Sequence, residues 1–234
     1  LLVLVNRISA SASEIFAGAM QDYQRGLIVG TPTFGKGTVQ TFHKVDYGRI
    51  KYTKAKFYRV SGQSTQHRGV VPDINLPSLY DPEEIGESAL EHALPWDQIR
   101  RVEYQTYPDI SRYLPKIKQE HAKRIANDPD FIYLSETIEH MNQLQNRDTV
   151  SLNEKIRLKE REEEKAWRLA TENKRRKAKG EELLDKLEES DDEDEEIELE
   201  DEDDEPDALL LESANILVDQ INFMAADRVK IADK

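Results

Sequence analysis

The sequence predicts an α/β fold at the start of the chain, followed by an all-α C-terminal region. Two apolar runs, residues 1–5 and 26–30, have the composition of strands buried on both faces, and a segment with helical periodicity separates them. After Asp81 strand signals are few, and long charged segments with helical character follow. A strand–helix–strand unit therefore opens the chain, and helices dominate the remainder.

The first helix is expected from about residue 12 to residue 24. Its apolar residues recur at helical spacing: Ile15, Phe16, Ala19, Met20 and Tyr23. Small and polar residues make up most of the preceding turn, residues 6–11. A serine at a sharp strand-to-helix turn exposes its hydroxyl beside free helix N–H groups, as a nucleophile and an oxyanion site require. Ser11 is therefore the first candidate for a catalytic residue.

A loop and a hairpin are expected after the second strand. The loop, residues 31–37, contains three glycine or proline breakers, and Lys36 stands between two of the glycines. Residues 38–45 and 49–60 are rich in Val, Thr, Phe and Tyr, and residues 46–48 supply a turn between them. A polar loop and a short extended exit should follow over residues 61–74.

The C-terminal region reads as a series of helices. Asp81 is a suitable cap for a helical stretch that opens at residues 82–85, and further helices are predicted over residues 110–126, 131–146 and 152–179. After Pro206 an apolar stripe follows spacings of four and three: Leu210, Ala214, Leu217, Ile221 and Met224. This last stripe predicts an amphipathic helix that docks on another part of the protein.

Composition limits the function classes. The formal net charge of −14 argues against a nucleic-acid partner, although much of it comes from residues 188–207. The absence of cysteine excludes disulfides, thiolate metal sites and a cysteine nucleophile. No apolar run approaches the roughly 20 residues that a membrane-spanning helix needs. Because the chain begins inside an apolar run at Leu1, we expect it to be the C-terminal part of a longer protein.

The acidic run at residues 188–207 has three interpretations. It is too highly charged and too poor in apolar residues to fold alone, which favours a solvated linker. Pairing with the basic segment 174–179 and weak binding of divalent cations are the alternatives. An EF-hand loop is not among them, because the run contains no glycine.

Ser11 also has a structural interpretation. Ser11 and Glu14 have the spacing of a capping box, in which both side chains satisfy N–H groups of the first helical turn. For catalysis a serine needs a base, and none of the five histidines has a context that marks it as one: His43, His67, His92, His121 and His140. A lysine amine can serve instead, which makes Lys36 the candidate base.

Such a lysine has to be neutral near pH 7, whereas its ordinary pKa is about 10.4. Burial lowers the pKa of an amine, and Phe34 and Val39 offer apolar cover to Lys36. The alternative is an ordinary solvent-exposed loop lysine. The loop at residues 30–38 also approaches the G-x-x-x-x-G-K-[ST] phosphate-binding pattern. Gly37 follows the lysine, however, and a strand pattern follows where a helix is needed, which weakens the nucleotide-binding interpretation.

Several ordered motifs together resemble those of the C-terminal processing peptidases, in particular the tail-specific protease branch of Gram-negative bacteria. These motifs are residues 9–14 (Ser-Ala-Ser-Ala-Ser-Glu), Asp22, residues 34–40 (Phe-Gly-Lys-Gly-Thr-Val-Gln) and residues 69–73 (Gly-Val-Val-Pro-Asp). The match covers roughly the first third of the chain. The charged helical remainder is similar to the additional C-terminal domain of that branch.

The resemblance implies site residues. Ser11 would be the nucleophile, Lys36 the general base, and Gln40 the residue that orients the lysine. The backbone N–H of Ala12 would give half of the oxyanion hole, with the other half from a glycine loop upstream of Leu1. Asp22 matches a further family position, where a supporting or a purely structural role is open. No metal or cofactor is implied.

The resemblance also implies the organisation of the protein. Residues 1–80 would be the C-terminal part of a crotonase-like serine protease core, and residues 81–187 a charged helical domain. Residues 188–207 would be an acidic linker and residues 208–234 an amphipathic helix. A peptide-binding PDZ domain would precede this chain, and residues 1–234 alone would then be inactive.

The function predicted in this way is a periplasmic Ser–Lys endopeptidase that acts on proteins with exposed C-terminal tails. An adaptor protein is a further candidate partner, and peripheral association with the inner membrane stays open without being indicated. Two alternatives remain. One is a non-catalytic interaction module on a protease-like fold, and the other is a nucleotide-binding protein.

Overall fold

A computed structural model describes residues 1–81, 83–107, 110–147, 149–187 and 207–232 of the chain. They form two compact units, one of residues 1–120 with 212–234 and the other of residues 121–211. Almost all of the predicted acidic linker, residues 188–206, lies outside the described residues. The domain boundaries expected after residues 80, 187 and 207 stay predictions.

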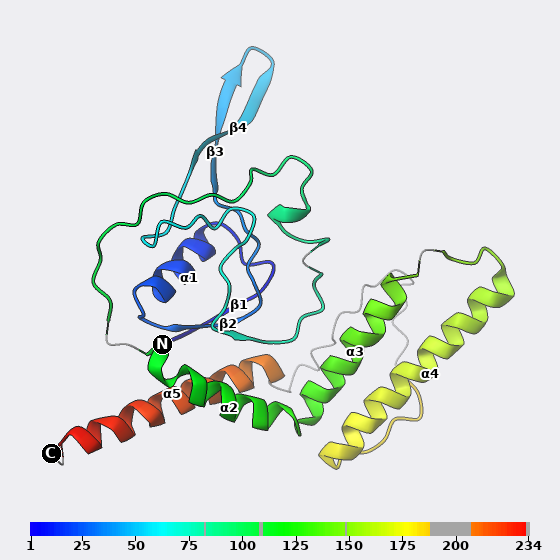
Figure 1. Cartoon of the computed structure of the whole chain (residues 1–234). Coiled ribbons are helices and arrows are strands. Elements are labelled where there is room, and N and C mark those ends of the chain that lie inside the picture. The colour runs from blue at the N-terminus through cyan, green and yellow to red at the C-terminus, as the bar shows by residue number, and fades with distance from the viewer. Residues whose placement is uncertain (82, 108–109, 148, 188–206, 233–234) are drawn as a thin grey trace. The chain divides into compact units, whose positions relative to one another are not determined.

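A three-stranded parallel sheet organises the first unit (Figure 1). Its strand order is β1 (Leu2–Val5), β2 (Leu27–Gly30) and β5 (Ile74–Asn75), and helix α1 (Ala12–Asp22) connects the first two strands. Val5 pairs with Gly30, which fixes the register of β1 on β2. A small core joins Ala17 of α1 to Val5, Ile28 and Val70. The predicted strand–helix–strand unit and the mixed α/β fold class are thus confirmed.

The predicted burial of this unit is only partly right. All four residues of β2 are buried, but Leu4 of β1 is 40% exposed, because β1 has a neighbouring strand on one side alone within the described sheet. On α1 the apolar residues whose spacing indicated the helix are not all covered, since Ile15 and Phe16 are 51% and 52% exposed. The helix instead turns Glu14, Ala17 and Gly18 inward. The buried face of α1 therefore includes a polar residue, Glu14.

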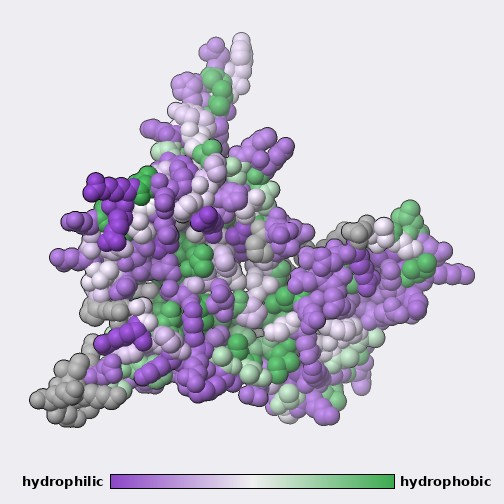
Figure 2. Space-filling view, in the orientation of Figure 1, coloured by the Kyte–Doolittle hydropathy of each residue, from purple (hydrophilic) through white to green (hydrophobic). Residues whose placement is uncertain are grey.

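The predicted hairpin is confirmed and projects from the sheet (Figure 1). Strands β3 (Thr38–Val45) and β4 (Gly48–Lys56) pair antiparallel, with Val45 opposite Gly48 across a two-residue turn. The second strand ends before the expected residue 60. Hydrophobic side chains are exposed along the hairpin (Figure 2), among them Phe42, Ile50 and Tyr52.

Residues 81–107 do not form the helical stretch expected from residue 82. Asp81 caps a single turn, since its Oδ1 accepts the backbone N–H of Glu83 at 2.7 Å, and the one helical segment described here is the short 3-10 helix Glu87–Ala89. The chain instead runs alongside the loop after the hairpin. The N–H of Ile99 donates to the carbonyl of Gly62 at 2.8 Å.

Two helices complete the first unit. The 3-10 helix Ser111–Tyr113 leads into α2 (Leu114–Ile125), as the prediction over residues 110–126 requires. Helix α5 (Ala208–Ala232) packs near it, since Tyr113 Oη donates to Asp227 Oδ2 at 3.0 Å. The predicted apolar stripe of α5 does not mark its buried face, because Leu210 and Ile221 are each 56% exposed. The buried positions are Glu212, Ser213, Ile216 and Gln220.

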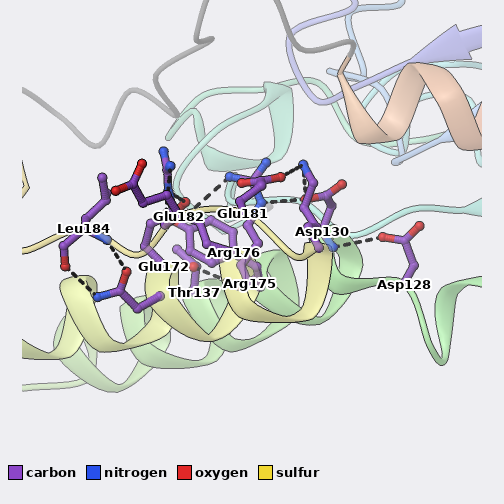
Figure 3. A network of polar contacts seen from close by, with 12 residues as sticks. Asp128, Asp130, Thr137, Glu172, Arg175, Arg176, Glu181, Glu182 and Leu184 are labelled. Carbon is purple, nitrogen blue, oxygen red and sulfur yellow. Dashed lines mark hydrogen bonds and ion pairs between the residues drawn. The ribbon is translucent and has the colours of Figure 1, made fainter.

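The second unit is built on helices α3 (Pro129–Gln145) and α4 (Glu154–Lys179), both predicted. Asp128 caps α3 by accepting the N–H groups of residues 130 and 131. The basic end of α4 pairs with the acidic start of α3 (Figure 3), with Arg175 Nε 2.5 Å from Asp130 Oδ1. The side chains of this pair are about a quarter exposed, so removal of one partner would leave a partly desolvated charge.

Candidate active site

Ser11 occupies a strained turn at the start of α1. It is the N-cap residue, and its φ of 59° and ψ of −108° are outside the usual regions for a residue with a Cβ atom. Strain of this kind costs about 1–3 kcal/mol and clusters at functional sites. Asn6 and Ser9 stabilise the turn, since the Asn6 N–H donates to Ser9 Oγ and the Ser9 N–H to Asn6 Oδ1, both at 3.1 Å. The geometry is that of a serine presented between a strand and a helix.

The capping-box arrangement of Ser11 and Glu14 is present, but its two halves differ. Glu14 Oε2 accepts the backbone N–H of Ser11 at 2.7 Å. The Ser11 side chain faces the backbone N–H of Glu14 as the other half of the box, although it makes no regular side-chain cap hydrogen bond. The structural interpretation of this pair is therefore supported at both residues, with the serine hydroxyl held less firmly than the glutamate.

Glu14 also binds the loop that carries the lysine. Its side chain is fully buried, and four groups donate to its two oxygens. Besides the Ser11 N–H these are Thr33 Oγ1 at 2.6 Å, the Gly35 N–H at 2.7 Å and the Lys36 N–H at 2.9 Å. Hydrogen bonds to a charged acceptor are short and strong, and four of them compensate for burial of the carboxylate. Glu14 thereby joins the serine turn to the lysine loop.

Lys36 lies in the loop after β2, as predicted. A further hydrogen bond, from the Phe34 N–H to the Ser9 carbonyl at 3.0 Å, holds this loop against the serine turn. The Lys36 side chain is half-buried. Within the described residues no hydrogen bond joins Lys36 Nζ to Ser11 Oγ, so the backbone segments meet while the side-chain contact is not made. Catalytic hydrogen bonds often tighten only when substrate is bound.

The backbone N–H of Ala12 is available to an oxyanion. Ala12 is the first residue of α1, where N–H groups have no partner within the helix, and no other described residue accepts this N–H. Gln40, by contrast, lies on β3 opposite Thr53, next to an irregularity in the pairing after Val39. Its side chain is exposed, and no described hydrogen bond links it to Lys36. The orienting role of Gln40 therefore stays a prediction.

Asp22 is held in an ion pair away from the serine and lysine. Its Oδ2 accepts Arg59 Nε at 2.9 Å and Ser61 Oγ at 3.1 Å. The Arg59 and Asp22 side chains are 12% and 8% exposed. These contacts fix the end of α1 against the loop after the hairpin, which supports the structural interpretation of Asp22.

Arg7 is a buried site residue that sequence analysis missed. It is 4% exposed, and its Nη1 donates to the Thr33 carbonyl at 2.7 Å. Burial lowers the pKa of this guanidinium, while the nearby Glu14 and Asp81 charges act in the opposite direction. An arginine in a turn is usually solvated, so no local sequence signal could have revealed this role.

The loop at residues 30–38 leads directly into β3 at Thr38. It therefore has no helix N-terminus of the kind that binds a nucleotide phosphate, which removes support from the nucleotide-binding alternative. The described part of the chain contains no group of three or more His, Asp or Glu side chains that could hold a metal ion.

Comparison with known proteins accounts for both regions of the chain. Residues 1–76 match Peptidase family S41, and residues 80–222 match the family described as C-terminal domain of tail specific protease. The chain belongs to the tail-specific protease family. This confirms the resemblance on which the site prediction depends.

The chain is similar to several named proteins. The Tail-specific protease of Haemophilus influenzae is 38% identical over 246 residues, an alignment that covers 100% of this chain and 34% of that protein. The Carboxy-terminal-processing protease of Bartonella bacilliformis is 46% identical over 97 residues, covering 38% of this chain and 22% of that protein. The solved Photosystem II D1 C-terminal processing protease is 46% identical, with a TM-score of 0.31, covering 35% of this chain and 20% of that one. The chain thus spans about a third or less of the length of these relatives.

None of the helices in the described residues is long and apolar enough to cross a membrane.

Proposed function

We propose that the intact protein is a serine endopeptidase with a Ser11–Lys36 dyad. The observation that carries this proposal is the buried Glu14 carboxylate, whose Oε2 binds the backbone N–H groups of both Ser11 and Lys36. A single oxygen thereby holds the proposed nucleophile and the proposed base on neighbouring segments. The family's peptidase assignment supports the same reaction class.

The reaction is acyl transfer in two steps. The neutral Lys36 amine takes the proton from Ser11 Oγ, which bonds to the carbonyl carbon of the scissile peptide, and the Ala12 N–H donates to the resulting oxyanion. Collapse of this intermediate breaks the C–N bond, and the Lys36 ammonium protonates the departing amine. Water, deprotonated by Lys36, then hydrolyses the ester on Ser11 and restores the hydroxyl.

Substrate class and location are part of the proposal. The tail-specific name of the Haemophilus influenzae relative supports substrates recognised by their C-terminal tails, and resemblance to the Gram-negative branch supports the periplasm. We further assign residues 1–80 to a crotonase-like protease core and residues 81–187 to the helical domain of this branch. Fractionation of the native organism, with the protein detected in the periplasmic extract, tests the location.

The dyad is tested by substitution in the intact protein, with cleavage of an unstructured C-terminal tail as the readout. Ser11→Ala and Lys36→Ala should each abolish cleavage while tail binding persists. Ser13→Ala and Lys44→Ala are matched controls, because both side chains are exposed. An active Lys36→Ala variant would exclude the proposed base. Binding without turnover by the unaltered protein would favour the interaction-module alternative.

A further inference from the structure

Residues 85–99, which we call the strap, contact the loops that carry both dyad residues. The strap lies within the part of the chain that matches the C-terminal domain of tail specific protease. It nevertheless belongs to the same compact unit as the residues that match the peptidase family. The C-terminal domain of this branch therefore begins as a segment packed on the candidate active site.

The strap is joined to the serine turn by Arg7, four residues before Ser11. Arg7 Nε donates to the Ile85 carbonyl at 2.5 Å, and Nη2 donates to Ser88 Oγ at 2.9 Å. Gly86 makes room for this guanidinium, since a Cβ atom on Gly86 would lie 2.2 Å from Arg7 Nη2. The guanidinium of Arg7 therefore ties the serine turn to the strap.

The strap is joined to the lysine loop by Glu87. Its backbone N–H donates to the Phe34 carbonyl at 2.9 Å. Its side-chain Oε1 accepts Gln66 Nε2 at 2.9 Å, and Gln66 Oε1 in turn accepts the Gly37 N–H at 2.9 Å. Gln66 is fully buried and Glu87 is 8% exposed. Contacts from one strap residue thus reach the lysine loop on both sides of Lys36.

The chemistry of the Gln66 side-chain amide explains why a carboxylate suits position 87. A glutamine side chain can point its oxygen or its NH2 group in a given direction, and the neighbouring groups decide which. Glu87 Oε1 and the Leu94 carbonyl are both acceptors, and both lie on the Nε2 side of Gln66. They therefore turn Oε1 of Gln66 towards the Gly37 N–H. A Cβ atom on Gly37 would lie 2.6 Å from the backbone nitrogen of Gln66, so the lysine loop packs closely on Gln66.

We propose that Glu87, acting through Gln66, is a positioning residue that holds the lysine loop in register with the serine turn. The inference rests on the proposed dyad, and it gives the tail-specific C-terminal domain a part in catalysis. Release of Gly37 would let Lys36 move away from Ser11 into solvent. The expected consequence is a lower kcat with an unchanged KM.

The kinetic test uses the intact protein and three variants. Glu87→Ala should lower kcat by roughly 10²-fold, the size of effect that a 1 Å displacement of a catalytic group can have. Glu87→Gln should restore most of the activity, because its carbonyl oxygen can still accept Gln66 Nε2. Glu91→Ala, on an exposed residue of the strap, is the control and should behave as the unaltered protein.

Hydrogen exchange at Gly37 provides a readout that does not depend on activity. In a Ser11→Ala background, Glu87→Ala should speed amide exchange in residues 34–37, and Glu87→Gln should largely restore protection. Unchanged exchange would overturn the inference even if Ser11 and Lys36 both prove essential. Equally, lower thermal stability with an unchanged kcat would reduce Glu87 to a structural residue. If Lys36→Ala is active, the proposed function fails separately, and the positioning role in catalysis fails with it.

Discussion

Glu14 Oε2 lies 2.9 Å from the backbone nitrogen of Lys36, although the two residues are 22 positions apart in the sequence. The same carboxylate accepts the N–H of Ser11. Since the carboxylate is fully buried, water cannot replace either donor. The distance between the serine turn and the lysine loop therefore depends on Glu14, which itself takes no part in the proposed proton transfer.

Substitution of Glu14 tests this dependence. Glu14→Gln keeps the shape of the side chain but replaces an acceptor oxygen with an NH2 group that faces two donors. We expect a loss of about 3 kcal/mol in unfolding free energy, the upper end for a hydrogen bond to a charged group. Chemical denaturation of the intact protein measures it, and Glu83→Gln is the exposed control. An unchanged transition would show that the carboxylate does not hold the two segments.

The Asp22–Arg59 pair should contribute to stability and leave the proton transfer unchanged. Loss of one partner strands a charge that is at most 12% exposed, so Asp22→Asn should destabilise the protein by about 3 kcal/mol. Asp22→Asn combined with Arg59→Met should recover part of this loss, which a double-mutant cycle measures. A shift in the pH dependence of kcat/KM without loss of stability would instead give Asp22 the supporting catalytic role that the sequence left open.

Gly86 should be more sensitive to substitution than Gly48. Both have a positive φ, 133° and 143°, so alanine introduces backbone strain at each, of about 1–3 kcal/mol. A Cβ atom meets Arg7 at Gly86, whereas it meets nothing within 4 Å at Gly48. Gly86→Ala should therefore lower the melting temperature of the intact protein further than Gly48→Ala. Equal effects would mean that Arg7 adjusts without cost.

Asp97 should titrate below the ordinary aspartate pKa of 3.8, chiefly because Lys56 donates a hydrogen bond to it. A carboxyl group with a lowered pKa in the folded state stabilises that state above its ordinary pKa. This contribution is lost as the pH falls through the lowered value. Lys56→Met should raise the pKa of Asp97, which an NMR titration of carboxyl-labelled aspartate records. An unchanged pKa would exclude Lys56 as the main cause.

Local sequence signals predicted most of the elements but not which faces are buried. The hairpin, α1 and the helices α2 to α5 follow from residue type and spacing. The apolar stripe of α5 misled at Ile221, which is exposed, and on α1 the spacing that indicated the helix includes the exposed Phe16. Periodicity shows that residues share a helix face, whereas the neighbouring elements decide whether that face is covered. The burial of Glu14 could not be anticipated, because three of its four donors come from a loop 19 to 22 positions away.

The sequence by itself determined the order of strand, turn and helix around Ser11, the glycine-flanked position of Lys36, and the family. These features depend on residues that are close together in the sequence. Local conformational preferences and the order of the motifs are therefore enough to predict them. Only the tertiary structure decided that Glu14 joins the two segments, that Asp22 pairs with Arg59, and that Gln66 connects Glu87 to Gly37. Each of these contacts spans about twenty positions or more, and its energy arises from desolvated polar groups that meet only after the chain has folded.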